Sequence, residues 1–199
     1  MELRVSPGNQ KMGSIPSISL PAVITCRDCD CKNKCYARKL ERIRPSVRNS
    51  YQSNLDLLHK HPDVFWREFE SVIMASRFFR LHVSGDIPDA DYLRNVIKIV
   101  ANNPHCEVLC FTKRYELVNR FLESGWLIPK NLHIIYSGWP GLEMNNPYSL
   151  PEAHVIFKDG TTEANETAVL CNGNCMECAI TESGCWNLKY GQQVVFHEH

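Results

Sequence analysis

The alternation of strand-like and helix-like segments between residues 78 and 138 constrains the fold more than any other feature of this chain. Residues 78–85, 106–113 and 131–138 are short apolar runs that predict strands. Residues 86–103 and 115–125 lie between them and have the spacing of helices. This order predicts a parallel sheet with helices packed on it. The fold class is therefore α/β, with either an open parallel sheet or a partial (βα) barrel.

The chain before this alternation contains three further predicted elements. Residues 17–25 alternate apolar and polar side chains, which predicts a strand, and Pro21 restricts that strand to an edge or a bend. Residues 46–60 and 62–77 have helical spacing, and Pro62 suits the first turn of a helix. A strand followed by two helices extends the α/β pattern towards the N-terminus.

The boundaries follow from where these patterns begin and end. We expect a single domain over residues 1–199, in which residues 1–17 form an N-terminal loop and residues 18–138 form the α/β body. Beyond residue 138 the pattern becomes loop-like and rich in cysteine. We therefore expect residues 139–199 to form a cysteine-rich C-terminal cap, with short strands at residues 154–158, 167–170 and 192–197.

Polar segments follow the predicted strands. In parallel α/β folds, functional residues gather where the carboxyl ends of the strands meet. We therefore expect Ser84, Gly85, Asp86 and Lys113 to bind a cofactor or substrate. The segments that should converge are the first cysteine run, Ser84-Gly85-Asp86, Thr112-Lys113-Arg114 and Ser137-Gly138-Trp139.

Eight of the ten cysteines fall into two tight runs. The N-terminus lacks the pattern of a leader peptide, and no apolar run approaches the length of a membrane helix, so we expect a cytoplasmic protein that does not enter membranes. In a reducing compartment, closely spaced thiols bind metal more often than they form disulfides. The candidate metal ligands are Cys26, Cys29, Cys31 and Cys35 in the first run, and Cys171, Cys175, Cys178 and Cys185 in the second.

The spacing within the runs favours iron–sulfur over zinc. Zinc sites commonly use paired C-x2-C knuckles, and neither run has that form. Unequal short gaps with a fourth cysteine further along suit a four-iron–four-sulfur cluster. In the second run Gly173 and its neighbouring asparagines can form turns around a cluster, and Trp186 can shield it. Zinc remains the alternative, and the eight thiols can form two centres or share one.

Several other residues suit structural roles. Cys106 and Cys110 are four residues apart in a predicted strand and suit a buried core. His82, within another predicted strand, also suits a hydrogen-bonded structural position. Asp89 and Asp91 sit where acidic residues cap a helix and favour its N-terminus.

The charge balance argues against nucleic acid as the main partner. The formal net charge is zero, whereas proteins that rely on phosphate contacts usually carry a positive excess. A local basic stretch offers either a solvated helix face or a contact surface for nucleic acid or an acidic partner. It comprises Arg38, Lys39, Arg42, Arg44 and Arg48.

Ordered motifs along nearly the whole chain resemble one protein family. They are GNQKMGSIPSISLPAVITC, KCYA, RLHVSGDIPDADYL, FTKR and the terminal VVFHEH. The chain resembles a bacteriophage and prophage family that is known by a gene product numbered eighty-eight. The resemblance implies a cysteine-rich iron–sulfur protein in the host cytoplasm and specifies no reaction.

The order of elements is also similar to that of the radical S-adenosylmethionine (SAM) enzymes. In that family a cysteine loop after the first strand holds a four-iron–four-sulfur cluster with an open iron, and a Gly-Gly-Glu-Pro segment contacts SAM. Residues 84–88 stand in a similar place, which implies SAM as a further cofactor. The family's C-x3-C-x2-C motif is incomplete in the first run, where Arg38 follows Cys31 and Cys35; the complete motif falls in the second run.

Three functional hypotheses follow. The first is a phage-type iron–sulfur protein with one or two clusters in a redox or structural role, whose partner is a small molecule or a redox protein. The second is a zinc-stapled module that binds nucleic acid or protein. The third is a radical SAM-like enzyme with an open iron. The sequence leaves open whether the protein is an enzyme.

Overall fold

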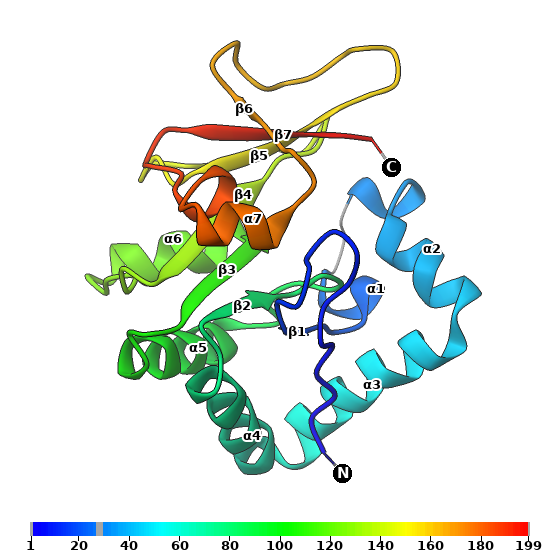
Figure 1. The fold of residues 1–199 in the computed structure, drawn as a ribbon, viewed down its shortest axis with the longest axis vertical. Coiled ribbons are helices and arrows are strands. Elements are labelled where there is room, and N and C mark those ends of the chain that lie inside the picture. Colours follow the sequence, from blue (N-terminus) through cyan, green and yellow to red (C-terminus); the bar gives the residue numbers. More distant parts are fainter. Residues whose placement is uncertain (1, 27–29, 199) are drawn as a thin grey trace.

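The computed structural model describes residues 2–26 and 30–198, without the side chains of residues 30 and 32. Its described strands form one seven-stranded sheet in which every pairing is parallel, so the predicted α/β class is confirmed (Figure 1). The spatial order is β1-β2-β3-β4-β5-β7-β6. The strands are β1 (Ser17–Ile18), β2 (Phe78–Leu81), β3 (Glu107–Thr112), β4 (Leu132–Ser137), β5 (Glu152–Ile156), β6 (Val169–Leu170) and β7 (Gln193–His197).

Helices occupy most of the connections between these strands. Four lie between β1 and β2, one lies in each of the next two crossovers, and one lies between β6 and β7. No helix within the described residues is both long and apolar enough to cross a membrane. The helices are α1 (Ala22–Thr25), α2 (Tyr36–Ile43), α3 (Pro45–Lys60), α4 (Pro62–Met74), α5 (Ala90–Asn102), α6 (Tyr115–Glu123) and α7 (Cys175–Ile180), with short 3-10 turns η1 (Asp30–Asn33) and η2 (Gly184–Trp186).

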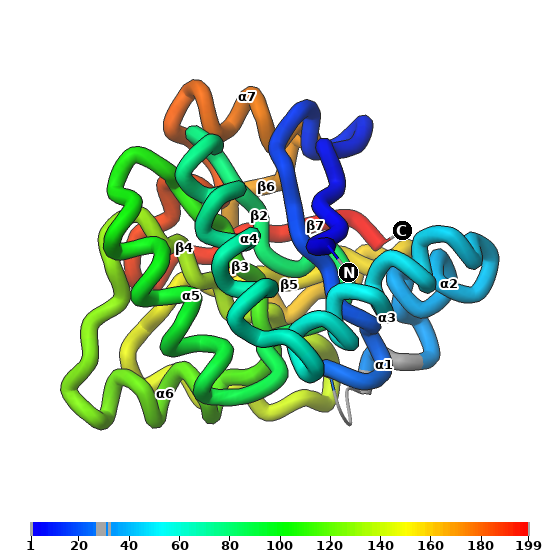
Figure 2. The backbone as a smooth tube through the Cα atoms, turned by 90° about the horizontal axis from the view of Figure 1, so that it is seen from below, coloured from blue at the N-terminus to red at the C-terminus, as the bar shows by residue number. Residues whose placement is uncertain are grey.

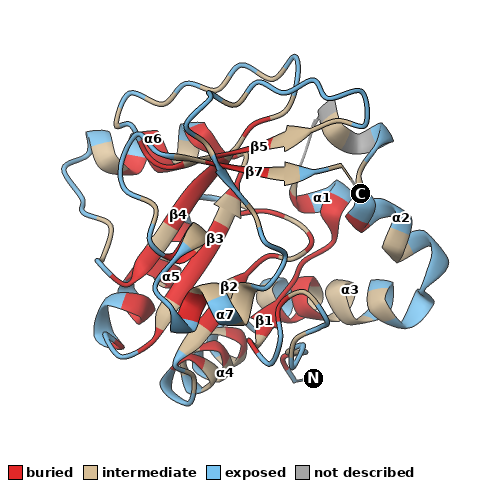
Figure 3. Cartoon of the chain, turned by 45° about the horizontal axis from the view of Figure 1, so that its top comes forward, coloured by how far each residue is buried: buried red, intermediate tan, exposed pale blue. Residues whose placement is uncertain are grey.

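The two faces of the sheet bury different parts of the chain. Successive strand residues point to opposite faces, so Val108 and Cys110 pack with the helices while Leu109 faces the other side. On that other side Leu109 packs in a cluster with Ala179 and Trp186. Figure 2 shows α7 and the N-terminal segment on the side of the strands opposite α5 and α6. The buried residues run along β3 and β4 between these layers (Figure 3).

The C-terminal segment differs from the expected cap. Instead of lying on a finished α/β body, residues 139–199 supply β5, β6 and β7 to the same sheet and place α7 against its second face. The parallel pairing of β4 with β5, and of β5 with β7, makes this segment continuous with the body. The cysteine-rich region therefore extends the same sheet and packs on its second face.

The elements before β2 also differ from the prediction. The expected strand at residues 17–25 is limited to β1, and α1 begins immediately after Pro21, whose φ of −60° is compatible with a helix start. The predicted edge position is confirmed, because β1 is the first strand of the row. The two helices expected at residues 46–60 and 62–77 are confirmed as α3 and α4.

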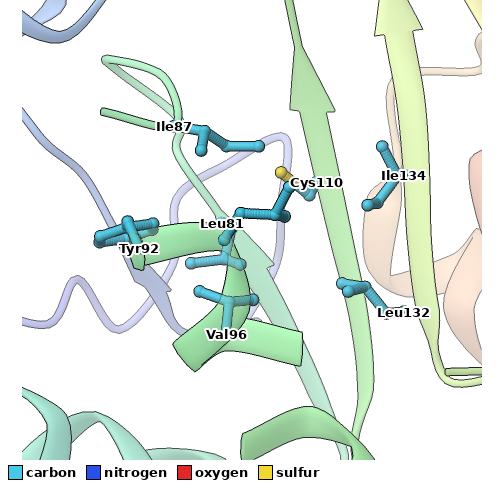
Figure 4. Close-up of a pocket in the computed structure, with 8 residues that line it drawn as sticks. Leu81, Ile87, Tyr92, Val96, Cys110, Leu132 and Ile134 are labelled. Carbon is cyan, nitrogen blue, oxygen red and sulfur yellow. The ribbon is translucent and has the colours of Figure 1, made fainter. Parts of the chain in front are cut away.

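A small apolar cavity lies on the helix-covered side of the sheet (Figure 4). Its volume is about 10 Å³, the lower limit for a single water molecule, so it is a packing void rather than a ligand site. Cys110 contributes to its wall, and Cys106 is also fully buried, which confirms the prediction that both are core residues. The lining residues are Leu81, Ile87, Tyr92, Leu93, Val96, Cys110, Leu132 and Ile134.

Candidate functional site

Side-chain hydrogen bonds join the carboxyl ends of the neighbouring strands, and we call this region the strand-end site. The Asp86 carboxylate accepts hydrogen bonds from the hydroxyl of Thr112 at 2.6 Å and from the backbone N–H of Lys113 at 2.8 Å. The Lys113 ammonium donates to Ser137 Oγ at 2.9 Å. The Asp86 N–H donates to Thr25 Oγ1 at 3.0 Å, next to the first cysteine run. The predicted convergence of these segments is confirmed.

Ser84 and Gly85 hold this loop against the helices that precede β2. Gly85 has a φ of +80°, and a Cβ at this position would lie 2.5 Å from the carbonyl oxygen of Leu20. The buried Ser84 hydroxyl donates to Glu41 Oε1 at 2.7 Å, and the same oxygen accepts from the N–H of Ala22. Both residues lie in the predicted site, where Ser84 bonds to Glu41 and Gly85 packs closely against the backbone of Leu20.

Burial affects the charge of Asp86. The loss of solvent raises the pKa of its carboxyl group, and the hydrogen bonds from Thr112, Lys113 and Ile87 oppose that rise. The pKa of Lys113 is lowered by burial, against the attraction of Asp86 and of the nearby thiols of Cys26 and Cys35. The strand-end site thus combines an acid and a base that both resist ionisation.

The first cysteine run lies beside this pair. Cys26 and Cys35 are half-buried, and each is close enough to Lys113 to act on its charge. Burial raises the pKa of Cys26 to about 12, with smaller contributions from Asp86 and Cys35. Cys31 is half-buried in η1, whereas Cys29 lies outside the described residues. Two of the four predicted ligands of this run therefore lie near Lys113, and Cys26 also lies near Asp86.

The second cysteine run gathers around one hollow on the second face of the sheet, and we call its members the four-thiol set. Cys171 follows β6, Cys175 and Cys178 lie on α7, and Cys185 lies in η2. The hollow measures about 20 Å³, enough for roughly one water molecule. Its wall comprises the four cysteines with Lys11, Arg80, Leu109, Phe111, Asn172, Asn174, Trp186 and Phe196.

Local structure positions these thiols. Gly184 has a φ of +54°, and a Cβ there would approach Cys178 Sγ to 3.0 Å. The Gly173 N–H lies 3.4 Å from Cys171 Sγ, and Cys178 Sγ lies 3.4 Å from Asn172 Oδ1. The turn chemistry of the asparagines and glycines therefore brings separate parts of the run to one place.

Burial makes two of the four thiols, Cys175 and Cys185, harder to deprotonate. Burial raises the pKa of Cys185 to about 12 and also raises that of Cys175. Within the described residues, no group of three or more His, Cys, Asp or Glu side chains is already arranged to hold a metal ion. A bound metal would have to rearrange these sulfurs and release their protons.

Two cations line the same hollow without a carboxylate partner among the described ion pairs. Arg80 Nη1 lies 3.7 Å from Cys175 Sγ, and the guanidinium lies 5.0 Å from the centroid of the Phe111 ring. Its Nε atom is buried without a hydrogen-bond partner in the described structure. The Lys11 ammonium lies 5.1 Å from the centroid of the Phe196 ring. Positive charge of this kind fits metal-bound thiolates, which are anionic.

Sequence reasoning did not identify Arg80 or Lys11. Arg80 alternates with the buried Phe79 and Leu81 in β2, so a charged residue on the opposite face of an apolar strand was the available signal. Lys11 reaches the set through tertiary structure, because the Cys175 N–H donates to the Lys11 carbonyl oxygen at 2.9 Å. No pattern within the N-terminal segment predicts that contact.

The remaining candidates have structural or surface positions. Burial lowers the pKa of His82 to about 3, and its Nε2 lies 3.0 Å from the Tyr92 hydroxyl oxygen, so this histidine is a neutral core residue. Asp89 caps α5 by accepting from the Tyr92 N–H at 2.8 Å, and Asp91 pairs with Arg94. Solvent-exposed positions on α2, on α3 or between them hold Arg38, Lys39, Arg42, Arg44 and Arg48.

These features define an α/β protein with an all-parallel sheet and two cysteine runs, one at the carboxyl ends of the strands and one on a face of the sheet. Residues 3–183 match the Gene product 88 family, and the chain belongs to that family. The Gene 88 protein of Mycobacterium phage L5 is 28% identical over 148 residues, which are 67% of this chain and 61% of the phage protein. The chain therefore spans about three-fifths of the length of this curated relative. No solved structure matches the chain, so the radical SAM resemblance remains a prediction.

Proposed function

We propose that this protein is an iron–sulfur protein and that its four-thiol set holds a four-iron–four-sulfur cluster in a redox or structural role. The observation that carries the proposal is that Cys171, Cys175, Cys178 and Cys185 line one hollow together with two cations. An iron–sulfur cluster accepts and releases single electrons when bound, and its potential depends on nearby charge and solvent. The chain's own contribution is to supply four sulfurs, exclude water and balance charge.

The surroundings of the set support a cluster. Trp186 packs within the hydrophobic cluster and donates its indole N–H to the carbonyl oxygen of Cys175 at 3.1 Å, which fixes the ring over the set. The Gly173 N–H is directed at a sulfur. Low solvent exposure and N–H donors to sulfur are features by which proteins tune the reduction potential of such clusters.

Zinc is the second candidate, because the hollow is small. A volume of about 20 Å³ suits a single ion, whereas a four-iron cube requires the thiols to move apart. Both candidates predict the same four ligands and differ in iron and sulfide content. A metal analysis therefore separates them directly.

A radical SAM-like reaction would have to use the first run rather than the second. Four cysteine ligands would saturate a cluster at the four-thiol set and leave no open iron. Cys26 and Cys35, beside Asp86 and Lys113, are the described thiols of the strand-end site. The sequential order from β1 to β5 supports a partial (βα) barrel for such an enzyme. Cleavage of SAM to 5′-deoxyadenosine by reduced protein would be the test.

The deciding experiment is anaerobic purification followed by absorption spectroscopy, Mössbauer spectroscopy and analysis of iron, sulfide and zinc. We expect iron and sulfide in equal amounts, with about four of each for every cluster. Cys175→Ser and Cys178→Ser should each lower the metal content, whereas Cys106→Ala, at a buried cysteine outside both runs, should retain it. Stoichiometric zinc without sulfide would show that the site is a zinc site and not an iron–sulfur cluster. The absence of both metals would refute a metal centre.

A further inference from the structure

We propose that Arg80 and Lys11 are the counter-charges of the four-thiol set, which they hold as an anionic metal–thiolate centre. This inference rests on the proposed function and assigns a role to two residues that are not metal ligands. Both side chains line the hollow, and both come from parts of the chain far from the second cysteine run. The inference explains why a neutral-charge protein places two cations beside four cysteines.

Arg80 carries the first part of the argument. It occupies a central position in the short strand β2, where its neighbours Phe79 and Leu81 are buried on the opposite face. A guanidinium against an aromatic ring and a thiol, with a buried Nε that lacks a partner, is costly in a metal-free protein. Deprotonated sulfur at Cys175, 3.7 Å from Nη1, would supply the missing negative charge.

Lys11 is brought to the set by the N-terminal loop of residues 8–13. The loop is closed by a bridge between Asn9 and Gly13, and its backbone bonds to α7 through Lys11 and Cys175. Gly13 lies directly against Met176, since a Cβ at this position would be 2.8 Å from the Met176 Cβ. Figures 1 and 2 both show this loop beside α7. The loop therefore covers the set and delivers a positive charge to it.

The charges balance for either metal. Four thiolates around one zinc ion have a net charge of about −2, and four thiolates around an oxidised four-iron–four-sulfur cluster have the same net charge of about −2. Arg80 and Lys11 together offset it. Reduction of a cluster adds a further negative charge, so the two cations should favour the reduced state and raise its potential.

The test measures metal retention and, for a cluster, the midpoint potential in purified holo protein. Arg80→Gln should speed metal loss to a chelator about 10-fold or more, the size of effect typical of groups just outside the ligands. Lys11→Gln should act in the same direction with a smaller effect, and both variants should lower the potential of a cluster. Arg80→Lys should retain much more metal than Arg80→Gln, because it keeps the positive charge.

Matched controls separate the effect of removing a positive charge beside the four-thiol set from the effect of removing one elsewhere. Arg77→Gln removes an arginine that lies 5.1 Å from the centroid of the Phe78 ring, just before the same strand, and Lys60→Gln removes an exposed lysine of α3. Both should leave metal retention and potential unchanged. If Arg80→Gln does not fold, as judged by circular dichroism, Lys11→Gln carries the test.

The outcomes distinguish the inference from the proposed function. Wild-type protein without iron or zinc refutes both. A metal centre that loses metal equally fast in wild type, Arg80→Gln and Lys11→Gln refutes the counter-charge role and leaves the metal centre standing. The inference is supported if metal retention falls in Arg80→Gln and Lys11→Gln and is unchanged in the Arg77→Gln and Lys60→Gln controls.

Discussion

At the scale of single residues, the strand-end site depends on backbone positions that the sequence marks only weakly. The segment Ser84-Gly85-Asp86 was predicted to bind a ligand because it follows a strand. In the structure Ser84 and Asp86 are buried and bonded to Glu41, Thr112 and the Lys113 backbone. Position after a strand predicted the place of these residues, but their partners come from segments distant in sequence.

Gly85 should be among the least replaceable residues of this site. Gly85→Ala combines a φ of +80° with a Cβ only 2.5 Å from a backbone oxygen, so we expect a loss of at least about 3 kcal/mol in the free energy of unfolding. Gly125→Ala is the matched control, because Gly125 has a φ of +81° and nothing within 4 Å of its Cβ position. It should cost only about 1–2 kcal/mol. Urea unfolding compares the two; equal losses would contradict the close contact.

His82 should make stability depend on pH. Its pKa is lowered by burial to about 3, below the usual value of about 6.5, so the folded state resists protonation that the unfolded chain accepts. Its stabilising contribution is complete above about pH 6.5 and falls by up to about 1.4 kcal/mol for each pH unit below that. His82→Asn suits the φ of +56° and removes the titration. Between pH 5 and 7 the free energy of unfolding should fall more steeply with falling pH in wild type than in His82→Asn. The same pH dependence in both proteins would argue against a buried neutral histidine.

At the scale of elements, the sequence predicted the regular central part of the chain better than its ends. The three strands and two helices between residues 78 and 138 are confirmed. Their apolar patterns run over enough residues to distinguish the 3.6-residue period of a helix from the two-residue period of a strand. The helix α1 was missed because residues 17–25 alternate like a strand, and α7 was missed because six residues containing two cysteines carry too little periodicity. The cysteine-rich region supplies β5 to β7 because strand pairing, which is non-local, places it there.

The start of α5 offers a test at this scale. Asp89→Ala removes the side chain that accepts from the Tyr92 N–H, so we expect a loss of about 1 kcal/mol in stability. Asp91→Ala, in the first turn of the same helix, removes an exposed side chain that pairs with Arg94 and should cost less than about 0.5 kcal/mol. Thermal and urea unfolding measure the difference. A larger loss for Asp91→Ala would contradict the assignment of Asp89 as the cap.

At the scale of the whole molecule, the two ends of the chain meet. The sequence left open a centre built from both cysteine runs, and this stays a prediction, because Cys29 lies outside the described residues. The contacts that join the ends are made by the N-terminal loop at Cys175 and by Lys34, which pairs with Glu198 at 3.4 Å. Sequence spacing could not predict this closure, because it depends on the parallel order that brings β7 next to β5.

This closure predicts that the N-terminal loop protects the four-thiol set from solvent. Gly13→Ala should displace the loop, because the added methyl would lie 2.8 Å from the Met176 Cβ at a φ of +64°. In metal-free, reduced protein we expect the four thiols to react with a maleimide at least about threefold faster than in wild type, since local opening governs access to partly buried groups. Gly160→Ala, with a φ of +85° and nothing near its Cβ position, should leave the rates unchanged.

Mass spectrometry assigns the modified cysteines. Cys106 and Cys110 should stay protected in wild type and in both variants, because they lie in the hydrophobic core on the other face of the sheet. Faster modification of those two as well would indicate general unfolding, and unchanged rates at the four-thiol set would show that the loop does not cover it.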